Sequence, residues 1–169
     1  MGISLNCKAS PLSDVIVKSL HSCRRAARRH ALLASLFVAW GALSASFFMS
    51  HVLAWAPCAL CMVQRVAMAA VTILLTAETI IRRTLLPRYA NAFTLLALTL
   101  SASGALIAAC HVLTQRLPPL SALIVHTCSM AVPCSSDPLV AHGFVPVPVL
   151  SFLAFAAIVA LSIVRLNNR

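Results

Sequence analysis

Apolar residues fill four long stretches of this chain, and short polar segments separate them. Each stretch reaches the roughly 20 apolar residues that a membrane-spanning helix needs. Inside lipid the backbone must satisfy its own hydrogen bonds, so such stretches are helical. The pattern therefore predicts an all-α integral membrane protein, a four-transmembrane-helix bundle. The predicted helices run over about Ala31–Trp55, Ala59–Ile81 and Ala90–Leu113, and from just after Pro148 to about Val164.

Two segments lie outside the predicted helices. Residues 1–30 form an N-terminal extension with no assignable motif, and residues 31–169 form one transmembrane domain. Within that domain, a longer outer loop at about 114–145 connects the third and fourth predicted helices. A cleaved secretory signal is the competing interpretation of the N-terminus. The apolar stretch after Arg29 is too long for the apolar region of a signal peptide, so we expect a membrane helix there.

The composition excludes a soluble domain. Hydrophobic residues make up 61% of the chain and charged residues only 9%, whereas soluble domains are about one quarter charged. The net charge of +10 would suggest nucleic-acid binding if the basic residues were clustered in a soluble domain. In a membrane protein we instead expect the lipid bilayer, and no nucleic acid, as a partner.

The positions of the basic residues predict the orientation. Arg116 is the only lysine or arginine on one side of the predicted bundle. Because lysine and arginine concentrate in cytoplasmic loops, we expect both termini and the loop between the second and third helices to be cytoplasmic. The basic residues on that side are Lys8, Lys18, Arg24, Arg25, Arg28, Arg29, Arg82, Arg83, Arg88, Arg165 and Arg169.

The seven cysteines divide according to this topology. Cys7 and Cys23 fall in the cytoplasm, where thiols stay reduced, and we interpret them as bystanders. Cys110, near the outer end of the third helix, is expected to be a small buried hydrophobic residue. The other four cysteines fall on the outer side in two close pairs, Cys58 with Cys61 and Cys128 with Cys134.

Cys58 and Cys61 form a C-x-x-C motif at the start of the second predicted helix. Pro57 suits the first turn of that helix, because the N–H that proline lacks would have no helical partner there. The amino end of a helix favours negative charge. Such a setting lowers the pKa of a thiol and produces the thiolate, which is the nucleophile of thiol–disulfide exchange.

Arg65 follows Cys61 by four residues and therefore lies on the same helix face, one turn deeper. Charges inside a membrane are costly and point to function. We expect its guanidinium to stabilise the Cys61 thiolate and an oxygen-bearing acceptor, the alternative being an arginine that only extends toward the headgroups. Glu78, near the other end of this helix, can pair with Arg82 four residues later, and we expect a structural role for that pair.

Cys128 and Cys134 are separated by five residues, which allows a disulfide without fixing its geometry. An exposed, loosely held disulfide is the reactive kind, with a more oxidising potential than a buried one. Two cysteine pairs on one side of a membrane therefore favour a redox relay. A disulfide that only staples the loop is the alternative.

Together these residues resemble the DsbB family of disulfide-generating membrane oxidoreductases, and most closely its shorter, BdbC-like members. The most specific part is Pro57-Cys58-Ala59-Leu60-Cys61-Met62-Val63-Gln64-Arg65, which has the family's P-C-x-L-C-x-x-Q/E-R form. The similarity extends to His51-Val52-Leu53, to His111, to the loop cysteines and to Gly143-Phe144-Val145-Pro146-Val147-Pro148. It covers the chain from the first predicted helix onward.

The resemblance implies a protein-dithiol:quinone oxidoreductase in a cytoplasmic (inner) membrane, with its redox cysteines on the periplasmic or extracytoplasmic side. It implies the disulfides Cys58–Cys61 and Cys128–Cys134. A DsbA-like thioredoxin-fold dithiol oxidase would be reoxidised at Cys128, and Cys134 would then attack Cys58. Cys61, beside Arg65, would pass two electrons to a quinone (ubiquinone or menaquinone). By the same resemblance, His111 would lie near the quinone pocket.

One feature departs from the longer family members, in which the loop cysteines are far apart and flank an amphipathic segment. Here Cys128 and Cys134 are only six positions apart. Loop motion and the partner protein are therefore expected to differ from those of the longer members.

Three other interpretations fit parts of the pattern. Four outer cysteines match the ligand count of a structural zinc site, although zinc would not explain Arg65. A vitamin K epoxide reductase-like enzyme is another four-helix thiol protein, but its loop cysteines precede the C-x-x-C motif. A disulfide-stapled membrane protein without redox catalysis is the third. The cofactor expectation is therefore a quinone and no metal.

Overall fold

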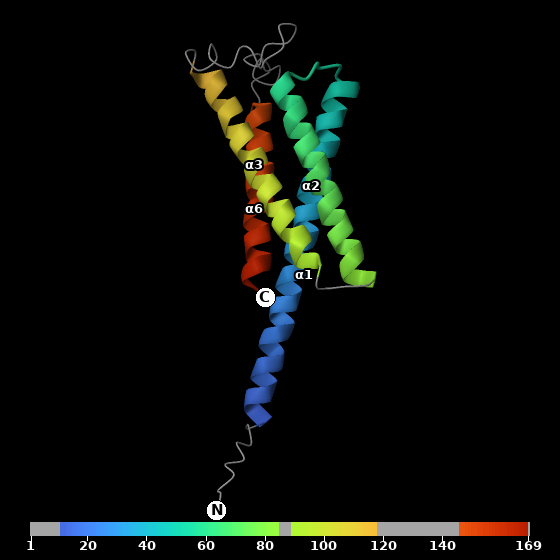
Figure 1. Ribbon diagram of the computed structural model, residues 1–169, viewed down its shortest axis with the longest axis vertical. Helices are drawn as coiled ribbons and strands as arrows, with labels where there is room; N and C mark the ends of the chain where they lie inside the picture. Colours follow the sequence, from blue (N-terminus) through green and yellow to red (C-terminus); the bar gives the residue numbers. More distant parts are fainter. Residues whose placement is uncertain (1–10, 85–88, 118–145, 169) are drawn as a thin grey trace, which may run out of the picture.

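The computed structural model describes residues 11–84, 89–117 and 146–168. These residues form four helices, each long and apolar enough to cross a membrane, which confirms the predicted all-α four-helix fold (Figure 1). The helices are α1 (Pro11–His51), α2 (Ala59–Thr84), α3 (Ala90–Arg116) and α6 (Val147–Asn167).

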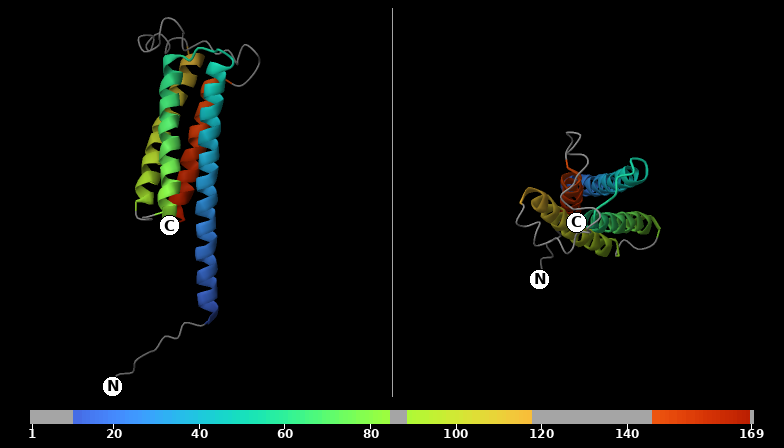
Figure 2. Two further views of the ribbon diagram at one scale, coloured as in Figure 1. Left: turned by 90° about the vertical axis from the view of Figure 1, so that its right-hand side faces the viewer. Right: turned by 90° about the horizontal axis from the view of Figure 1, so that it is seen from above.

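The four helices form an antiparallel ring. α1 packs beside α2 and α6, and α3 closes the ring by packing against the same two helices. Figure 2 shows this ring from the side and along its axis, with α1 extending well beyond the other helices at one end. The α2 start and the α3 end therefore lie at the same end of the bundle, and the α2 end lies at the opposite end (Figure 1).

The first helix differs from its predicted bounds at both ends. It begins at Pro11, so part of the predicted N-terminal extension is continuous with it, and it ends at His51. The predicted end at Trp55 is wrong because Ala54 has a positive φ of 53°. Residues other than glycine seldom adopt this left-handed conformation, and a right-handed α-helix cannot continue through it.

Small and apolar side chains fill the centre of the bundle. At the α3–α6 contact, Gly104 faces the fully buried ring of Phe155 so closely that an added Cβ would lie 2.6 Å from it. Large apolar side chains such as Phe37 (82% exposed) and Leu106 (69%) face outward. An apolar outer surface of this extent suits lipid, and it would be exceptional for a soluble protein. The central cluster comprises Leu32, Ala39, Met68, Val71, Leu75, Ala97, Phe155 and Ile158.

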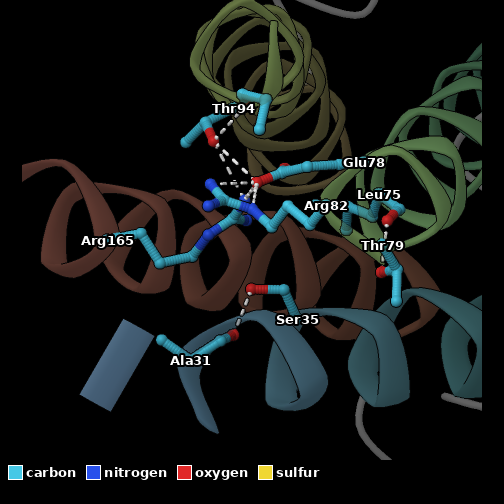
Figure 3. A network of polar contacts seen from close by, with 9 residues as sticks. Ala31, Ser35, Leu75, Glu78, Thr79, Arg82, Thr94 and Arg165 are labelled. Atoms are coloured by element: carbon cyan, nitrogen blue, oxygen red, sulfur yellow. Dashed lines mark hydrogen bonds and ion pairs between the residues drawn. The ribbon is translucent and has the colours of Figure 1, made fainter. Parts of the chain in front are cut away.

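A buried ion cluster joins three helices at the end of the bundle where α2 finishes (Figure 3). The predicted Glu78–Arg82 pair is confirmed, with 2.7 Å between the carboxylate and the guanidinium. Arg165 of α6 reaches the same carboxylate and also donates to the Thr94 hydroxyl at 2.9 Å. The sequence suggested only an orientation signal at Arg165, but its side chain is 1% exposed.

Candidate functional site

Cys58 lies directly before α2 and caps its amino end. Its Sγ accepts a hydrogen bond from the backbone N–H of Cys61 at 3.4 Å, and its carbonyl accepts one from Met62 at 3.0 Å. A side chain that accepts from the third residue of a helix is the usual N-cap arrangement. Pro57 therefore precedes the cap, and its predicted place in the first turn is wrong by one or two positions.

The two sulfurs of the C-x-x-C motif are 3.1 Å apart, with both cysteines reduced. Cys58 is buried, whereas Cys61 is partly exposed. The Cys58–Cys61 disulfide stays a prediction, but the distance between the sulfurs shows that the backbone already brings the two thiols together.

His111 of α3 lies against Cys58, with 3.8 Å between its Nε2 and the Cys58 sulfur. Its other ring nitrogen, Nδ1, lies 3.3 Å from the Gln64 amide nitrogen. If the Gln64 amide donates to Nδ1, then Nδ1 accepts and carries no proton. The proton of a neutral His111 ring is then on Nε2, the nitrogen that faces the Cys58 sulfur. The sequence did not suggest a role for Gln64, although its place within the C-x-x-C-x-x-Q-R motif was a usable signal.

These contacts favour a thiolate at Cys58. The hydrogen bond with the Cys61 thiol is the largest cause that lowers the pKa of Cys58, and burial opposes it. The contacts with His111 and with the Cys61 N–H lower the pKa further, so it falls from 9.0 to about 4. A thiolate that is stable at neutral pH is the reactive form in disulfide exchange.

Arg65 points from α2 toward α1. Its guanidinium donates to the Ser46 hydroxyl and the Ser46 carbonyl, both at 2.9 Å, and to the Ser50 hydroxyl. It also lies 5.0 Å from the centre of the Phe47 ring, a cation–π distance. These contacts hold the partly exposed guanidinium at a defined place between α1 and α2.

Two adjoining cavities connect these residues. The larger, of about 230 Å³, lies between α1, α2 and α6 and is lined by Cys61, Gln64, Arg65 and mostly apolar residues. The smaller, of about 70 Å³, is lined by Cys58, Cys61, Arg65 and His111. Both cysteines therefore line a space that Arg65 and His111 also line.

The remaining cysteines are placed as follows. Cys128 and Cys134 lie outside the described residues, as does Cys7. Cys23 is exposed on α1. Cys110 is exposed as well, so the expectation that it is buried is wrong. It precedes the inward-facing His111, and neighbouring positions on a helix point in different directions.

Cys58, Cys61 and His111 could also hold a metal ion, since their ligand atoms all lie within 4.8 Å of one another. Two thiolates and one imidazole match the three protein ligands of some catalytic zinc sites. This set differs from the four-cysteine site considered above. The sulfurs of Cys58 and Cys61, which would bind the metal, are also the atoms that the redox chemistry of a C-x-x-C pair uses.

Comparison with known proteins identifies the family. Residues 28–165 match the family described as disulfide bond formation protein DsbB. The disulfide bond formation protein C of Bacillus subtilis (strain 168) is 31% identical over 128 residues, which cover 76% of this chain and 86% of that protein. The probable disulfide formation protein C 2 of Bacillus cereus is 29% identical over 134 residues, covering 79% and 89%.

No solved structure matches this chain significantly. The family match covers α2 and α3 completely and most of α1 and α6, includes the C-x-x-C motif and His111, and agrees with the membrane bundle. The chain belongs to the DsbB family of membrane oxidoreductases that generate disulfide bonds.

Proposed function

We propose that this protein reoxidises an extracytoplasmic, DsbA-like thioredoxin-fold dithiol oxidase and passes the electrons to a membrane quinone. The observation that carries the proposal is the arrangement around Cys58 and Cys61. Their sulfurs lie 3.1 Å apart, both cysteines line the smaller cavity, Cys61 also lines the larger one, and Arg65 lines both. A thiol pair with one buried and one partly exposed sulfur, near a positive charge and within an apolar bundle, suits electron transfer to a lipid-soluble acceptor.

The electron path runs through two disulfides. The partner's dithiol attacks the Cys128–Cys134 disulfide, loses two electrons and two protons, and leaves as a disulfide. The loop dithiol then reduces the Cys58–Cys61 disulfide through a mixed disulfide between Cys134 and Cys58, so that the membrane pair holds the two electrons and two protons. Cys58 is attacked when the mixed disulfide forms and is released when that mixed disulfide is resolved. Its low pKa suits the release, because a thiol of low pKa leaves fastest.

The larger cavity has the chemistry that a quinone requires. Its lining is mainly apolar, as the ring needs, and Arg65 supplies hydrogen-bond donors for a carbonyl oxygen. When bound, a quinone accepts two electrons and two protons. Cys61 lies at this cavity and would deliver the electrons, while Arg65 orients the acceptor. His111 lines the smaller cavity and contacts Cys58, so its role would be to hold a proton at that sulfur.

The orientation follows from charge. Arg24, Arg25, Arg28 and Arg29 precede the apolar part of α1, and Arg82 ends the apolar part of α2. All of them lie toward the end of the bundle opposite the cysteine pair. The positive-inside rule makes that end cytoplasmic and the cysteine end extracytoplasmic. Disulfides persist on the extracytoplasmic side.

Quinone reduction by the purified protein, with a reduced thioredoxin-fold dithiol as electron donor, tests the proposal. The wild-type protein should turn over, and Cys58→Ser, Cys61→Ser, Cys128→Ser and Cys134→Ser should each abolish turnover. Cys23→Ser and Cys110→Ser are matched controls that should retain it. Full turnover in the Cys61→Ser variant would contradict the mechanism.

A further inference from the structure

Three side chains that can bind a metal converge at the start of α2. The sulfurs of Cys58 and Cys61 and one ring nitrogen of His111 all lie within 4.8 Å of one another. The C-x-x-C spacing brings the two cysteines together, and His111 reaches them from the end of α3. Two helices therefore hold the set in place before an ion arrives, which lowers the free-energy cost of ordering the ligands on binding.

The distances within this set are close to those of a zinc site. Zinc binds thiolate sulfur at about 2.3 Å and imidazole nitrogen at about 2.0–2.1 Å in tetrahedral geometry, which places sulfur and nitrogen about 3.6 Å apart and two sulfurs about 3.8 Å apart. The Cys58 sulfur lies 3.8 Å from Nε2 of His111 and 3.1 Å from the Cys61 sulfur. A small rotation of the Cys61 side chain, which is partly exposed, would open the sulfur pair to the required separation.

Gln64 can support the histidine ligand. Its amide nitrogen lies 3.3 Å from Nδ1 of His111, and Gln64 is 4% exposed. When Nε2 binds a metal, Nδ1 carries the ring proton. Turning the Gln64 amide over presents its oxygen to that proton. A hydrogen-bond acceptor at the second ring nitrogen is the usual partner of a metal-bound histidine.

Charge and space at the site also suit zinc. A Zn²⁺ ion bound by two thiolates has no net charge, so the positive charge of Arg65, which lines the same cavity, opposes it little. The cavity of about 70 Å³ beside Cys58, Cys61 and His111 has room for a water molecule as the fourth ligand. Three protein ligands and one water complete a tetrahedral zinc site.

We propose that Cys58, Cys61 and His111 bind a Zn²⁺ ion when the cysteine pair is reduced, and that the bound ion prevents formation of the Cys58–Cys61 disulfide. Zinc displaces the proton of each thiol and leaves the oxidation state of both sulfurs unchanged. The disulfide needs the same sulfurs, so the ion must leave before the pair loses its two electrons. Zinc binding requires neither a quinone nor a partner protein, and only its effect on turnover rests on the proposed function.

Zinc binding to the purified full-length protein, measured by competition with a colorimetric chelator, tests the site. We expect the reduced protein to bind Zn²⁺ and the protein oxidised with diamide to lose it. His111→Ala and Cys61→Ser should each weaken binding by roughly tenfold or more, because loss of a group that only orients a ligand already costs about 10–100-fold. Gln64→Leu should weaken binding by about tenfold, whereas Gln64→Glu, whose carboxylate also accepts from Nδ1, should not.

Cys128→Ser combined with Cys134→Ser is the control, since it removes two thiols but none of the proposed ligands. This double variant should keep the wild-type zinc affinity, and circular dichroism verifies that all variants keep their helices. Loss of zinc in the double variant with retention in His111→Ala would overturn the site in favour of four cysteine ligands. Equal affinity of the reduced and oxidised proteins would overturn it as an adventitious ion.

Oxidation by diamide, which accepts two electrons and two protons from a dithiol, tests the block in the same double variant. Thiol counting should show that Zn²⁺ slows disulfide formation in proportion to the fraction of protein that holds the ion, and that EDTA restores the rate. An unchanged rate with zinc bound would contradict the block. The assay contains neither quinone nor partner, so its failure leaves the proposed electron path untouched.

Discussion

The Cys58 sulfur lies 3.8 Å from Nε2 of His111, although the two residues are 53 positions apart in the chain. The contact forms because the start of α2 and the end of α3 meet at one end of the antiparallel bundle. Both residues are buried, and the Gln64 amide nitrogen lies beside Nδ1, the other ring nitrogen of His111. The resemblance to the family suggested His111 as a residue of the quinone pocket, and the geometry adds a direct contact with the Cys58 sulfur.

The thiolate at Cys58 should persist at acidic pH. Its pKa of about 4 means that the sulfur is ionised at pH 6, half ionised near pH 4 and protonated below that. The difference in thiolate ultraviolet absorbance between the reduced wild-type protein and Cys58→Ser, measured against pH, gives the midpoint. His111→Ala should move this midpoint to higher pH, because the imidazole lowers the pKa. A midpoint at the ordinary thiol value in the wild-type protein would contradict the assignment.

Replacing Arg65 should separate electron transfer from partner exchange. Arg65→Ala removes the guanidinium from the larger cavity and its hydrogen bonds to Ser46 and Ser50. We expect the KM for quinone to rise by about tenfold or more, since a charge-assisted hydrogen bond contributes roughly 1.5–3 kcal/mol. The rate of disulfide exchange with the partner, followed in a single turnover without quinone, should change much less. Equal losses in both assays would indicate a role in folding instead.

Removing the carboxylate of Glu78 should destabilise the bundle strongly. Glu78→Gln leaves Arg165 buried without its ionic partner, a change that costs about 3–5 kcal/mol in buried ion pairs. Unfolding in mixed detergent micelles measures this loss. Combining Glu78→Gln with Arg165→Met should recover most of the stability, because the buried unpaired charge is then gone. A double variant as unstable as the single one would show that the pair is not the cause.

The two glycines in the bundle should respond differently to substitution by alanine. Gly104→Ala places a Cβ 2.6 Å from the buried Phe155 ring, and overpacking of this kind costs about 1–3 kcal/mol. Gly41→Ala meets nothing within 4 Å and should be neutral or stabilise by up to about 1 kcal/mol through helix propensity. Thermal unfolding of both variants makes the comparison. Similar midpoints for the two would contradict close α3–α6 packing at Gly104.

Much of this protein follows from local sequence. The apolar stretches require helices because lipid offers the backbone no hydrogen-bond partners, and their ends are marked by charges and prolines. The Pro57–Arg65 motif singles out the C-x-x-C cysteines and Arg65, because it is defined by the spacing of these residues along one short segment. The Glu78–Arg82 pair is predictable for the same reason, as the residues lie one turn apart.

Only the tertiary structure decides which distant residues meet. Periodicity does not specify how helices are rotated about their axes or which of them are neighbours, so it cannot place His111 against Cys58 or Arg165 against Glu78. It also cannot show that Arg65 turns toward Ser46, or that Cys110 faces outward while the next residue is buried. The C-x-x-C pair thus follows from the sequence alone. The cavities around it exist because α1, α2, α3 and α6 close into one ring.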